Sequence, residues 1–316
     1  MRIDKSMLTR AQQYVAYRRN LGFKLAIEGG QILNFARYAD SIRHRGPLTV
    51  DLALAWARLA TDATRLYQAR RLEIVRGFAR YLSVFESQTQ IPGNRLLGPA
   101  HRRTQPHIYS AASINTLISA AEKLAPTKGL RPRTYATLIG LMAATGLRTS
   151  EALHLLREDV NFEDGLITIR DTKFHKSRLV PVDDTVGRAL RTYAAARDAH
   201  FCPGQSSAFL LGENRRALSG RTVHWTFRRL CKACGLRPAE GGNEPRLYDL
   251  RHTFCTRRLL QWHEQGVDVE QALPALSTYV GHVKVTDTYW YLSAIPELLA
   301  VTGAKFERFA HEAKGA

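Results

Sequence analysis

The chain has 316 residues, 45% of them hydrophobic and 23% charged, a composition typical of a folded protein that is long enough for two domains. It contains no run of about 20 apolar residues that could cross a membrane and no apolar signal at its start, so we expect a cytoplasmic protein. The net charge is +18 and is divided between both halves of the chain, which favours nucleic acid over an anionic membrane as the partner.

Helical periodicity dominates residues 7–88. Thr49 is a candidate N-cap for a helix over residues 49–60, and a longer helix is predicted over residues 64–85. The apolar residues on one side of the longer helix are Leu66, Ile74, Val75, Phe78 and Leu82. The arginines on its other side are Arg65, Arg70, Arg71, Arg76 and Arg80. Such a row can be a solvated helix face, but phosphate contacts fit a basic helical unit better, with Arg70 and Arg71 as leading candidates.

Residues 89–109 have the composition of a basic linker. Prolines and glycines interrupt any helical pattern there, and Arg102 and Arg103 add two further candidates for DNA contacts. We therefore predict a helical DNA-binding domain over residues 1–88 and a second domain over residues 110–316.

The second domain is predicted to be mainly α-helical with a small antiparallel β-sheet. Ser110 is a candidate N-cap for a helix over residues 111–124, and helical patterns follow at residues 133–145 and 150–156. The predicted strands are residues 160–162, 166–169 and 178–182, joined by two short turns. After Asp183 the pattern is helical again to the end of the chain.

The chain has four cysteines, of which Cys231 and Cys234 form a CxxC pair. A structural zinc site would need a second pair at similar spacing, and Cys202 and Cys255 do not supply one. Reduced, mostly buried thiols are therefore the better interpretation, and we expect no metal.

Cleaving a DNA phosphodiester without a metal sets three chemical requirements. These are a nucleophile, a proton donor for the leaving 5′ oxygen, and fixed positive charge beside the non-bridging oxygens. Arginine suits the last task because its planar guanidinium binds phosphate oxygens in pairs and stays charged. The sequence lacks the acidic clusters that hold two magnesium ions, which disfavours a metal-dependent nuclease.

Three short strings carry residues suited to this chemistry. In ATGLRTSE at residues 144–151, a helix breaks at Gly146, Arg148 lies at the start of the next helix, and Glu151 is one turn further on, placed to hold it. The second string is LYDLRHTF at residues 247–254, with Arg251 near its middle. The third is VGH at residues 280–282, which is followed nine residues later by Tyr291.

In these strings the chain resembles the tyrosine recombinase (phage integrase) family over roughly residues 110–310. The signature of that family is a TGLR-x-SE box, a lysine on a β-hairpin, an HxLRH box, a GH box and a terminal tyrosine, and all five occur here in order. The resemblance implies that Arg148 and Arg251 bind the scissile phosphate and that His282 hydrogen-bonds to it. It implies that Tyr291 is the nucleophile and Glu151 the support of the first arginine.

The resemblance also implies a hairpin lysine that protonates the leaving 5′-hydroxyl. Lys173 is the first candidate, and Lys176 is the alternative because both flank the same turn. Tyr289 is the rival nucleophile, but it lies two residues before Tyr291, so the two side chains point in different directions on a helix.

Two departures from the family pattern stand out. The family usually has histidine three residues before the second arginine, where this chain has Tyr248. A phenol can donate a hydrogen bond to phosphate but is a poor base near neutral pH, so Tyr248 is expected to bind or position the phosphate.

The second departure is the spacing from Arg251 to His282, which at 31 residues is longer than the family leads us to expect. We place the surplus in a loose connection over residues 266–279, where Pro274 interrupts the helical pattern.

The architecture implied is a C-shaped clamp on double-stranded DNA. Its N-terminal part would be the family's core-binding domain, and its catalytic domain would form a 3′-phosphotyrosine without metal or ATP. The apolar stripe of residues 295–309 would dock on a neighbouring copy, giving a homotetramer on paired recombination sites. The alternatives are a type IB topoisomerase-like enzyme and a DNA-binding protein with a decayed site.

Overall fold

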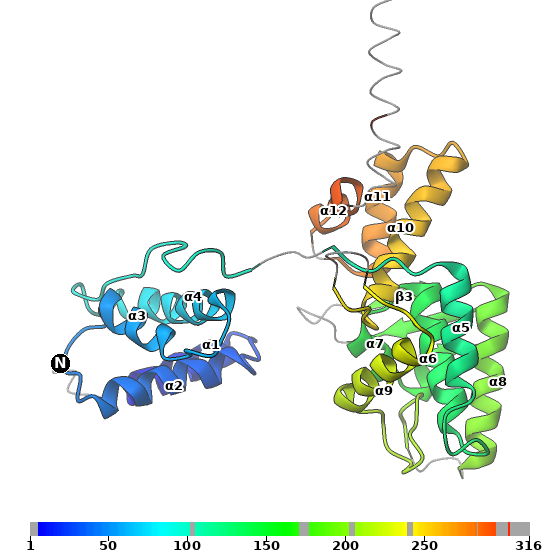
Figure 1. Ribbon diagram of the computed structural model, residues 1–316, viewed down its shortest axis with the longest axis horizontal. Helices are drawn as coiled ribbons and strands as arrows, with labels where there is room; N and C mark the ends of the chain where they lie inside the picture. The colour runs from blue at the N-terminus through cyan, green and yellow to red at the C-terminus, as the bar shows by residue number, and fades with distance from the viewer. Residues whose placement is uncertain are drawn as a thin grey trace, which may run out of the picture. The chain divides into compact units, whose positions relative to one another are not determined.

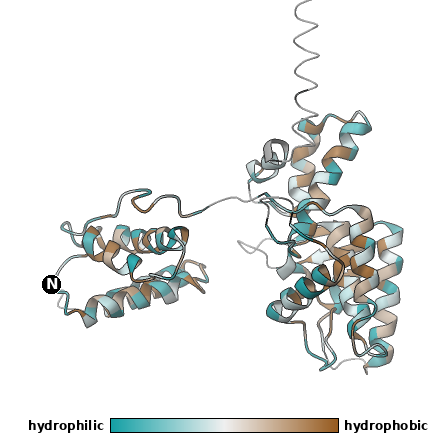
Figure 2. Cartoon of the chain, viewed as in Figure 1, coloured by the Kyte–Doolittle hydropathy of each residue, from teal (hydrophilic) through white to brown (hydrophobic). Residues whose placement is uncertain are grey.

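The computed structural model of the chain describes residues 6–101, 105–170, 177–201, 206–238, 243–282, 284–294 and 303. It divides into two compact units, Met1–Arg103 and Thr104–Ala316, and each unit has its own hydrophobic core. Figure 2 shows hydrophobic and hydrophilic residues interleaved along the helices of both units, as expected for helices that each bury one face. In the described residues no helix is long and apolar enough to span a membrane.

The first unit contains four helices (Figure 1). They are α1 (Met7–Asn20), α2 (Glu28–Ser41), α3 (Val50–Arg58) and α4 (Arg65–Leu82). The predicted cap of α3 is confirmed, because the Thr49 hydroxyl accepts a hydrogen bond from the Leu52 amide at 3.2 Å. The core is built around Phe35, which makes edge-to-face contacts with Trp56 and Phe78 at centroid distances of 5.5 and 6.4 Å.

One expectation for helix α4 is wrong. Leu66 is 41% exposed and does not belong to the buried side that Val75, Phe78 and Leu82 form; it lies in the first turn, where the helix is not yet covered. On the same helix, the Arg71 guanidinium lies 3.9 Å from the centre of the Trp56 ring. That stacking partly buries the side chain, and the burial lowers the pKa of Arg71.

The second unit is mainly helical with a three-stranded antiparallel sheet, as predicted. Its helices before the sheet are α5 (Ala111–Ala121), α6 (Arg131–Thr145) and α7 (Thr149–Leu153), followed by a 3-10 turn (Arg157–Asp159). The strands are β1 (Val160–Asn161), β2 (Leu166–Ile169) and β3 (Arg178–Pro181), in the order β1-β2-β3. The helices after the sheet are α8 (Asp184–His200), α9 (Gly220–Ala233), α10 (Asp249–Glu264), α11 (Val269–Val280) and α12 (Thr286–Ala294).

The main core of this unit lies between α5, α6, the sheet, α8 and α9. Ile167 and Val180, paired across β2 and β3, turn into it. The predicted cap of α5 is confirmed, since the Ser110 hydroxyl accepts a hydrogen bond from the Ser113 amide at 3.0 Å. A smaller core joins α10, α11 and α12 around Leu273 and Leu276, and it carries Tyr291.

The prediction that the chain is helical throughout after Asp183 is wrong. Residues 206–219 form an irregular connection in which isolated bridges pair Leu156 with Ala208 and Leu211 with Ala217, and residues 243–248 are also non-helical. The buried run Ala208–Leu211 explains the error, because a short apolar run does not distinguish helix from extended chain.

The expected loose connection over residues 266–279 is also wrong. Most of that segment is helix α11, and Pro274 lies inside it. A proline in a helix interior removes one backbone hydrogen bond and costs about 3 kcal/mol. The helix continues because Leu273 and Leu276 on either side of the proline are buried, so packing outweighs the local preference.

Candidate active site

Arg148 lies at a sharp junction between α6 and α7. Gly146 ends α6 in the left-handed conformation with φ of +62°, and a Cβ on this glycine would lie 2.5 Å from the Phe254 ring. Only glycine fits both the backbone and the space. The next helix then begins with Arg148 as its N-cap residue, which fixes the direction of the arginine side chain.

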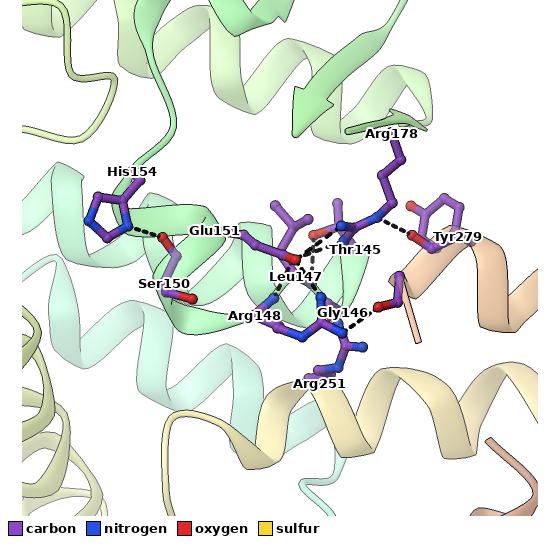
Figure 3. A network of polar contacts seen from close by, with 11 residues as sticks. Thr145, Gly146, Leu147, Arg148, Ser150, Glu151, His154, Arg178, Arg251 and Tyr279 are labelled. Carbon is purple, nitrogen blue, oxygen red and sulfur yellow. Dashed lines mark hydrogen bonds and ion pairs between the residues drawn. The ribbon is translucent and has the colours of Figure 1, made fainter. Parts of the chain in front are cut away.

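Glu151 holds Arg148 as the sequence suggested (Figure 3). Its carboxylate accepts hydrogen bonds from the Arg148 amide at 2.9 Å and from Arg148 Nη1 at 2.6 Å. Arg178, the first residue of β3, adds two more at 3.0 and 2.8 Å. Burial alone would raise the pKa of Glu151, but the hydrogen bonds and charges of Arg178 and Arg148 outweigh it and lower the pKa to about 2. Glu151 is therefore ionised and links the two arginines.

The same network reaches the end of α11. Arg148 Nη2 donates a hydrogen bond to the Gly281 carbonyl, and Arg178 Nε donates one to the Tyr279 carbonyl at 2.8 Å. Gly281 has φ of +72°, and a Cβ there would lie 2.7 Å from the Arg178 guanidinium. The glycine of the VGH string thus lets two arginines approach the backbone beside His282.

Arg251 is a fully buried cation. Its side chain is 0% exposed, and Nη1 donates a hydrogen bond to the Gly146 carbonyl at 2.7 Å. Nε and Nη2 are also buried, and no residue in the described part of the chain accepts a hydrogen bond from them. Buried donors without acceptors are costly and therefore uncommon. The remaining two donors have the fork geometry that suits a phosphate oxygen.

His282 lies against Tyr291. Its Nδ1 is 2.7 Å from the Thr288 hydroxyl, and its ring stacks on the Tyr291 ring with centroids 6.3 Å apart and 15° between the planes. Burial, and then the charges of Arg251 and Arg148, lower the pKa of His282 to about 4. The imidazole is therefore neutral at pH 7 in the DNA-free chain.

Tyr291 and Tyr289 differ sharply in environment. Tyr291 is 2% exposed and Tyr289 is 45% exposed, as expected for residues two apart on a helix. The Tyr291 hydroxyl lies 2.9 Å from His252 Nδ1. Burial raises the pKa of Tyr291 above its ordinary value, although Arg251 opposes the rise. The phenol is thus protonated, and ionisation requires a group that takes its proton.

Tyr248 stands at the start of α10 as its N-cap residue and is 36% exposed. Its ring meets the His252 ring edge to face, with centroids 5.1 Å apart. Tyr248 and Arg251 lie three residues apart at the start of this helix. His252 is the last residue of the same signature box, where sequence reasoning assigned it no role; it follows Arg251 directly and is one turn from Tyr248.

Sequence reasoning also missed Arg178. It opens a predicted strand and belongs to none of the three strings, so only the fold reveals that it holds Glu151. Lys173, Lys176, Arg102 and Arg103 lie outside the described residues. Arg70 is exposed on α4, in the other unit.

No group of three or more His, Cys, Asp and Glu side chains that could hold a metal occurs among the described residues. Cys231 is buried in the main core, and burial raises its pKa to about 12. The thiol is therefore protonated, which fits a packing role and not a metal ligand.

The chain matches the model of the phage integrase family over residues 109–297. It is 40% identical over 302 residues to the Sinorhizobium fredii protein named "Putative integrase/recombinase y4rB", covering 94% of this chain and 96% of that protein. A Tn1549 transposon integrase in complex with transposon right end DNA has a similar fold, with a TM-score of 0.70 and 17% identity over 97% of this chain and 100% of that one. A lambda integrase tetramer bound to a Holliday junction gives a TM-score of 0.59 and 18% identity over 89% of this chain and 77% of that one.

Proposed function

This chain belongs to the phage integrase family and is a tyrosine site-specific recombinase that cleaves and rejoins DNA, and from that premise we propose how its residues divide the reaction. Tyr291 is the nucleophile, Arg148 and Arg251 bind the scissile phosphate, and His282 hydrogen-bonds to it. The substrate is double-stranded DNA at specific recombination sites.

The observation that carries these roles is the two unused donors of buried Arg251. They lie in one network with Arg148, because Arg251 bonds to Gly146 at the break before Arg148. Arg148 in turn bonds to Gly281 beside His282, whose ring stacks on Tyr291. Two cations, a neutral imidazole and a phenol therefore converge within one unit, which is the set of groups that metal-free phosphoryl transfer needs.

In the cleavage step, the Tyr291 oxygen forms a bond to phosphorus and the bond from phosphorus to the 5′ oxygen breaks. The product is a 3′-phosphotyrosine and a free 5′-hydroxyl. The leaving oxygen takes a proton from a general acid, for which Lys173 is the candidate and Lys176 the alternative. Attack by a 5′-hydroxyl of the partner strand reverses these bond changes and joins the strands, so the energy of the broken bond is kept in the ester.

We further propose that the enzyme acts as a tetramer that clamps paired DNA sites. The lambda integrase with a similar fold was crystallised as a tetramer on a Holliday junction. In this chain a pocket of about 290 Å³ opens between β3, α10 and α11, with Phe254, Trp262 and Tyr279 among its lining residues. Its apolar lining suits the stripe of residues 295–309 from a neighbouring copy; that segment lies outside the described residues.

The test is a trapping experiment on a nicked duplex that carries the DNA flanking this gene, incubated with wild-type protein, Tyr291→Phe and Tyr289→Phe. We expect a covalent protein–DNA band from wild type and Tyr289→Phe but not from Tyr291→Phe, and we expect the band to persist in EDTA. A band that is lost only with Tyr289→Phe would show that Tyr289, and not Tyr291, is the nucleophile. No band from a wild-type protein that binds the DNA would contradict the proposed mechanism.

A second substrate set separates recombination from simple relaxation. Two duplexes with paired sites should give exchanged strands, whereas a type IB topoisomerase-like enzyme would relax supercoiled DNA without exchange. Exchange that requires Tyr291 supports the recombinase, and relaxation alone supports the topoisomerase-like alternative.

A further inference from the structure

His252 lies within hydrogen-bond distance of the hydroxyl group of Tyr291 and could take its proton. Its Nδ1 is 2.9 Å from the Tyr291 hydroxyl. In the tautomer of the neutral imidazole that carries its proton on Nε2, Nδ1 accepts this bond from the phenol. The contact exists in the DNA-free chain, so the phenol is already held by an acceptor before a phosphate arrives.

The other groups near the phenol are poorly suited to take its proton. The Cys255 thiol also contacts Tyr291, but burial raises the pKa of Cys255, so it already carries a proton. His282 directs Nδ1 at the Thr288 hydroxyl. Tyr248 is itself a phenol, and its ring touches His252 at 5.1 Å between centroids. Of these side chains, His252 is the one with a ring nitrogen within hydrogen-bond distance of the reacting oxygen.

The position of His252 also gives a reason for Tyr248, which stands where the family usually has a histidine. Residues 248 and 252 are four apart at the start of α10, so they lie on the same side of the helix one turn apart. Trp290 contacts the His252 ring from α12 at 5.8 Å between centroids. Tyr248, Trp290 and Tyr291 together enclose the imidazole, and Tyr248 supplies one wall of that enclosure.

We propose that His252 accepts the phenol proton of Tyr291 during cleavage and that Tyr248 acts through His252 as a positioning residue. This inference rests on the proposed function of Tyr291. As the bond from the Tyr291 oxygen to phosphorus forms, the proton moves to His252 Nδ1 and the ring becomes imidazolium. The 5′ oxygen takes its proton from the separate general acid. In the joining step the imidazolium returns its proton to the departing phenol.

The charges around His252 fit a neutral base that becomes charged only during the reaction. Burial lowers the pKa of His252 to about 4, Asp249 opposes this, and Arg251 and Arg246 add to it. Asp249 is fully buried and hydrogen-bonded to Arg246. Among the described residues, Tyr248 and Tyr291 contact the ring, and His282 interacts with it electrostatically. The lone pair is therefore available at pH 7.

The test compares His252→Asn with Tyr248→Phe. The Asn amide oxygen keeps a hydrogen-bond acceptor near the place of Nδ1 but cannot take a proton, and Phe keeps the ring that packs on His252 without its hydroxyl. Formation of the covalent complex is timed under single-turnover conditions from pH 5.5 to 9, on the natural duplex and on a duplex with sulfur as the 5′ bridging atom. A sulfur leaving group needs no general acid, so this duplex isolates proton removal from the phenol.

We expect His252→Asn to slow cleavage by about 100-fold or more on both duplexes, the usual scale of general-base catalysis. The wild-type rate should be flat from pH 5.5 to 9, because His252 is already neutral there. The rate of His252→Asn should instead rise with pH, because the solvent must then take the phenol proton. Tyr248→Phe keeps the ring that packs on His252, so it should slow cleavage less than His252→Asn does. A wild-type rate from His252→Asn, full recovery on the sulfur duplex, or an equal loss from Tyr248→Phe would each overturn the proposal.

Two controls keep the result interpretable. DNA binding and the melting temperature are measured for each variant, and His252→Gln is a second substitution if His252→Asn does not fold. Wild-type protein must give the covalent band that Tyr291→Phe lacks. If wild-type protein gives no covalent band, the proposed function is wrong. If wild-type protein gives the band and His252→Asn forms it at the same rate, only the proposed role of His252 is wrong.

Discussion

At the scale of single residues, the site consists of one buried arginine and of half-buried charges and neutral imidazoles held close together. Glu151 is shared by two arginines, whereas Arg251 retains two donors without acceptors among the described residues. The strings located Arg148, Arg251, His282 and Tyr291 because each carries its chemistry in the residue type. They assigned no role to Arg178 or to His252, because the contacts of these two side chains with Glu151 and Tyr291 appear only in the fold.

The two histidines predict an acid-sensitive fold. His252 and His282 each have a pKa of about 4 in the folded chain, against about 6.5 when unfolded. Below pH 6.5 the unfolded chain therefore binds protons that the folded chain does not, and stability falls until about pH 4. The loss is at most about 1.4 kcal/mol per pH unit for each histidine.

Denaturant unfolding from pH 4 to pH 8 checks this dependence. The variants His252→Asn and His282→Asn should each show a shallower decline than wild type between pH 6.5 and pH 4. A decline of unchanged slope in both variants would mean that other groups cause the acid sensitivity.

At the scale of elements, the site depends on where helices end. Gly146 ends α6 and Gly281 ends α11, and both glycines lie under side chains of the site. The helices themselves followed from apolar periodicity and cap residues such as Ser110. Pro274 and the run Ala208–Leu211 misled the prediction, because tertiary packing decided their structure and local sequence did not.

The break at Gly146 should not tolerate a side chain. Gly146→Ala would place a residue with Cβ in the left-handed region, at a cost of about 1–2 kcal/mol, and the Cβ would also press on the Phe254 ring. We expect a lower melting temperature together with slower covalent-complex formation, because Arg148 and the acceptor of Arg251 both shift.

Gly187→Ala is the matched control. Gly187 lies within α8, and no atom lies within 4 Å of the place its Cβ would take. Alanine there should stabilise the chain by up to about 1 kcal/mol without a change in cleavage. If Gly146→Ala and Gly187→Ala changed the melting temperature and the cleavage rate equally, the helix break at Gly146 would have no special role in the site.

At the scale of the whole molecule, two units with separate cores divide the chain, and the basic excess is found in both. Composition and charge already indicated a polyanion, and the strings indicated the catalytic unit. The first unit lacks such strings, so its partner surface had to be inferred from arginines alone. Of the two leading candidates, Arg71 stacks on Trp56, while Arg70 is exposed.

We expect the exposed arginines of α4 to bind phosphates without reading sequence. The variant with Arg65→Ala, Arg70→Ala and Arg80→Ala should bind its DNA more weakly at an unchanged melting temperature. The slope of log affinity against log salt should fall by about 0.9 for each phosphate that the variant no longer neutralises. Arg37→Ala, on the exposed side of α2, is the control. If it lowered the salt slope by as much per removed charge as the α4 variant does, the effect would come from net charge and not from contacts of α4.

The unused donors of Arg251 also predict that the melting temperature of the protein rises when it binds its recombination site. Two buried N–H groups of Arg251 have no acceptor among the described residues, which lowers the stability of the DNA-free fold. A bound phosphodiester would supply these acceptors. Any duplex that binds only the folded form raises the unfolding free energy by about 2.7 kcal/mol when present at 100 times its dissociation constant. A library of duplexes ranked by the melting temperature they confer would thus rank candidate recombination sequences, even with Tyr291→Phe protein that cannot cut any of them.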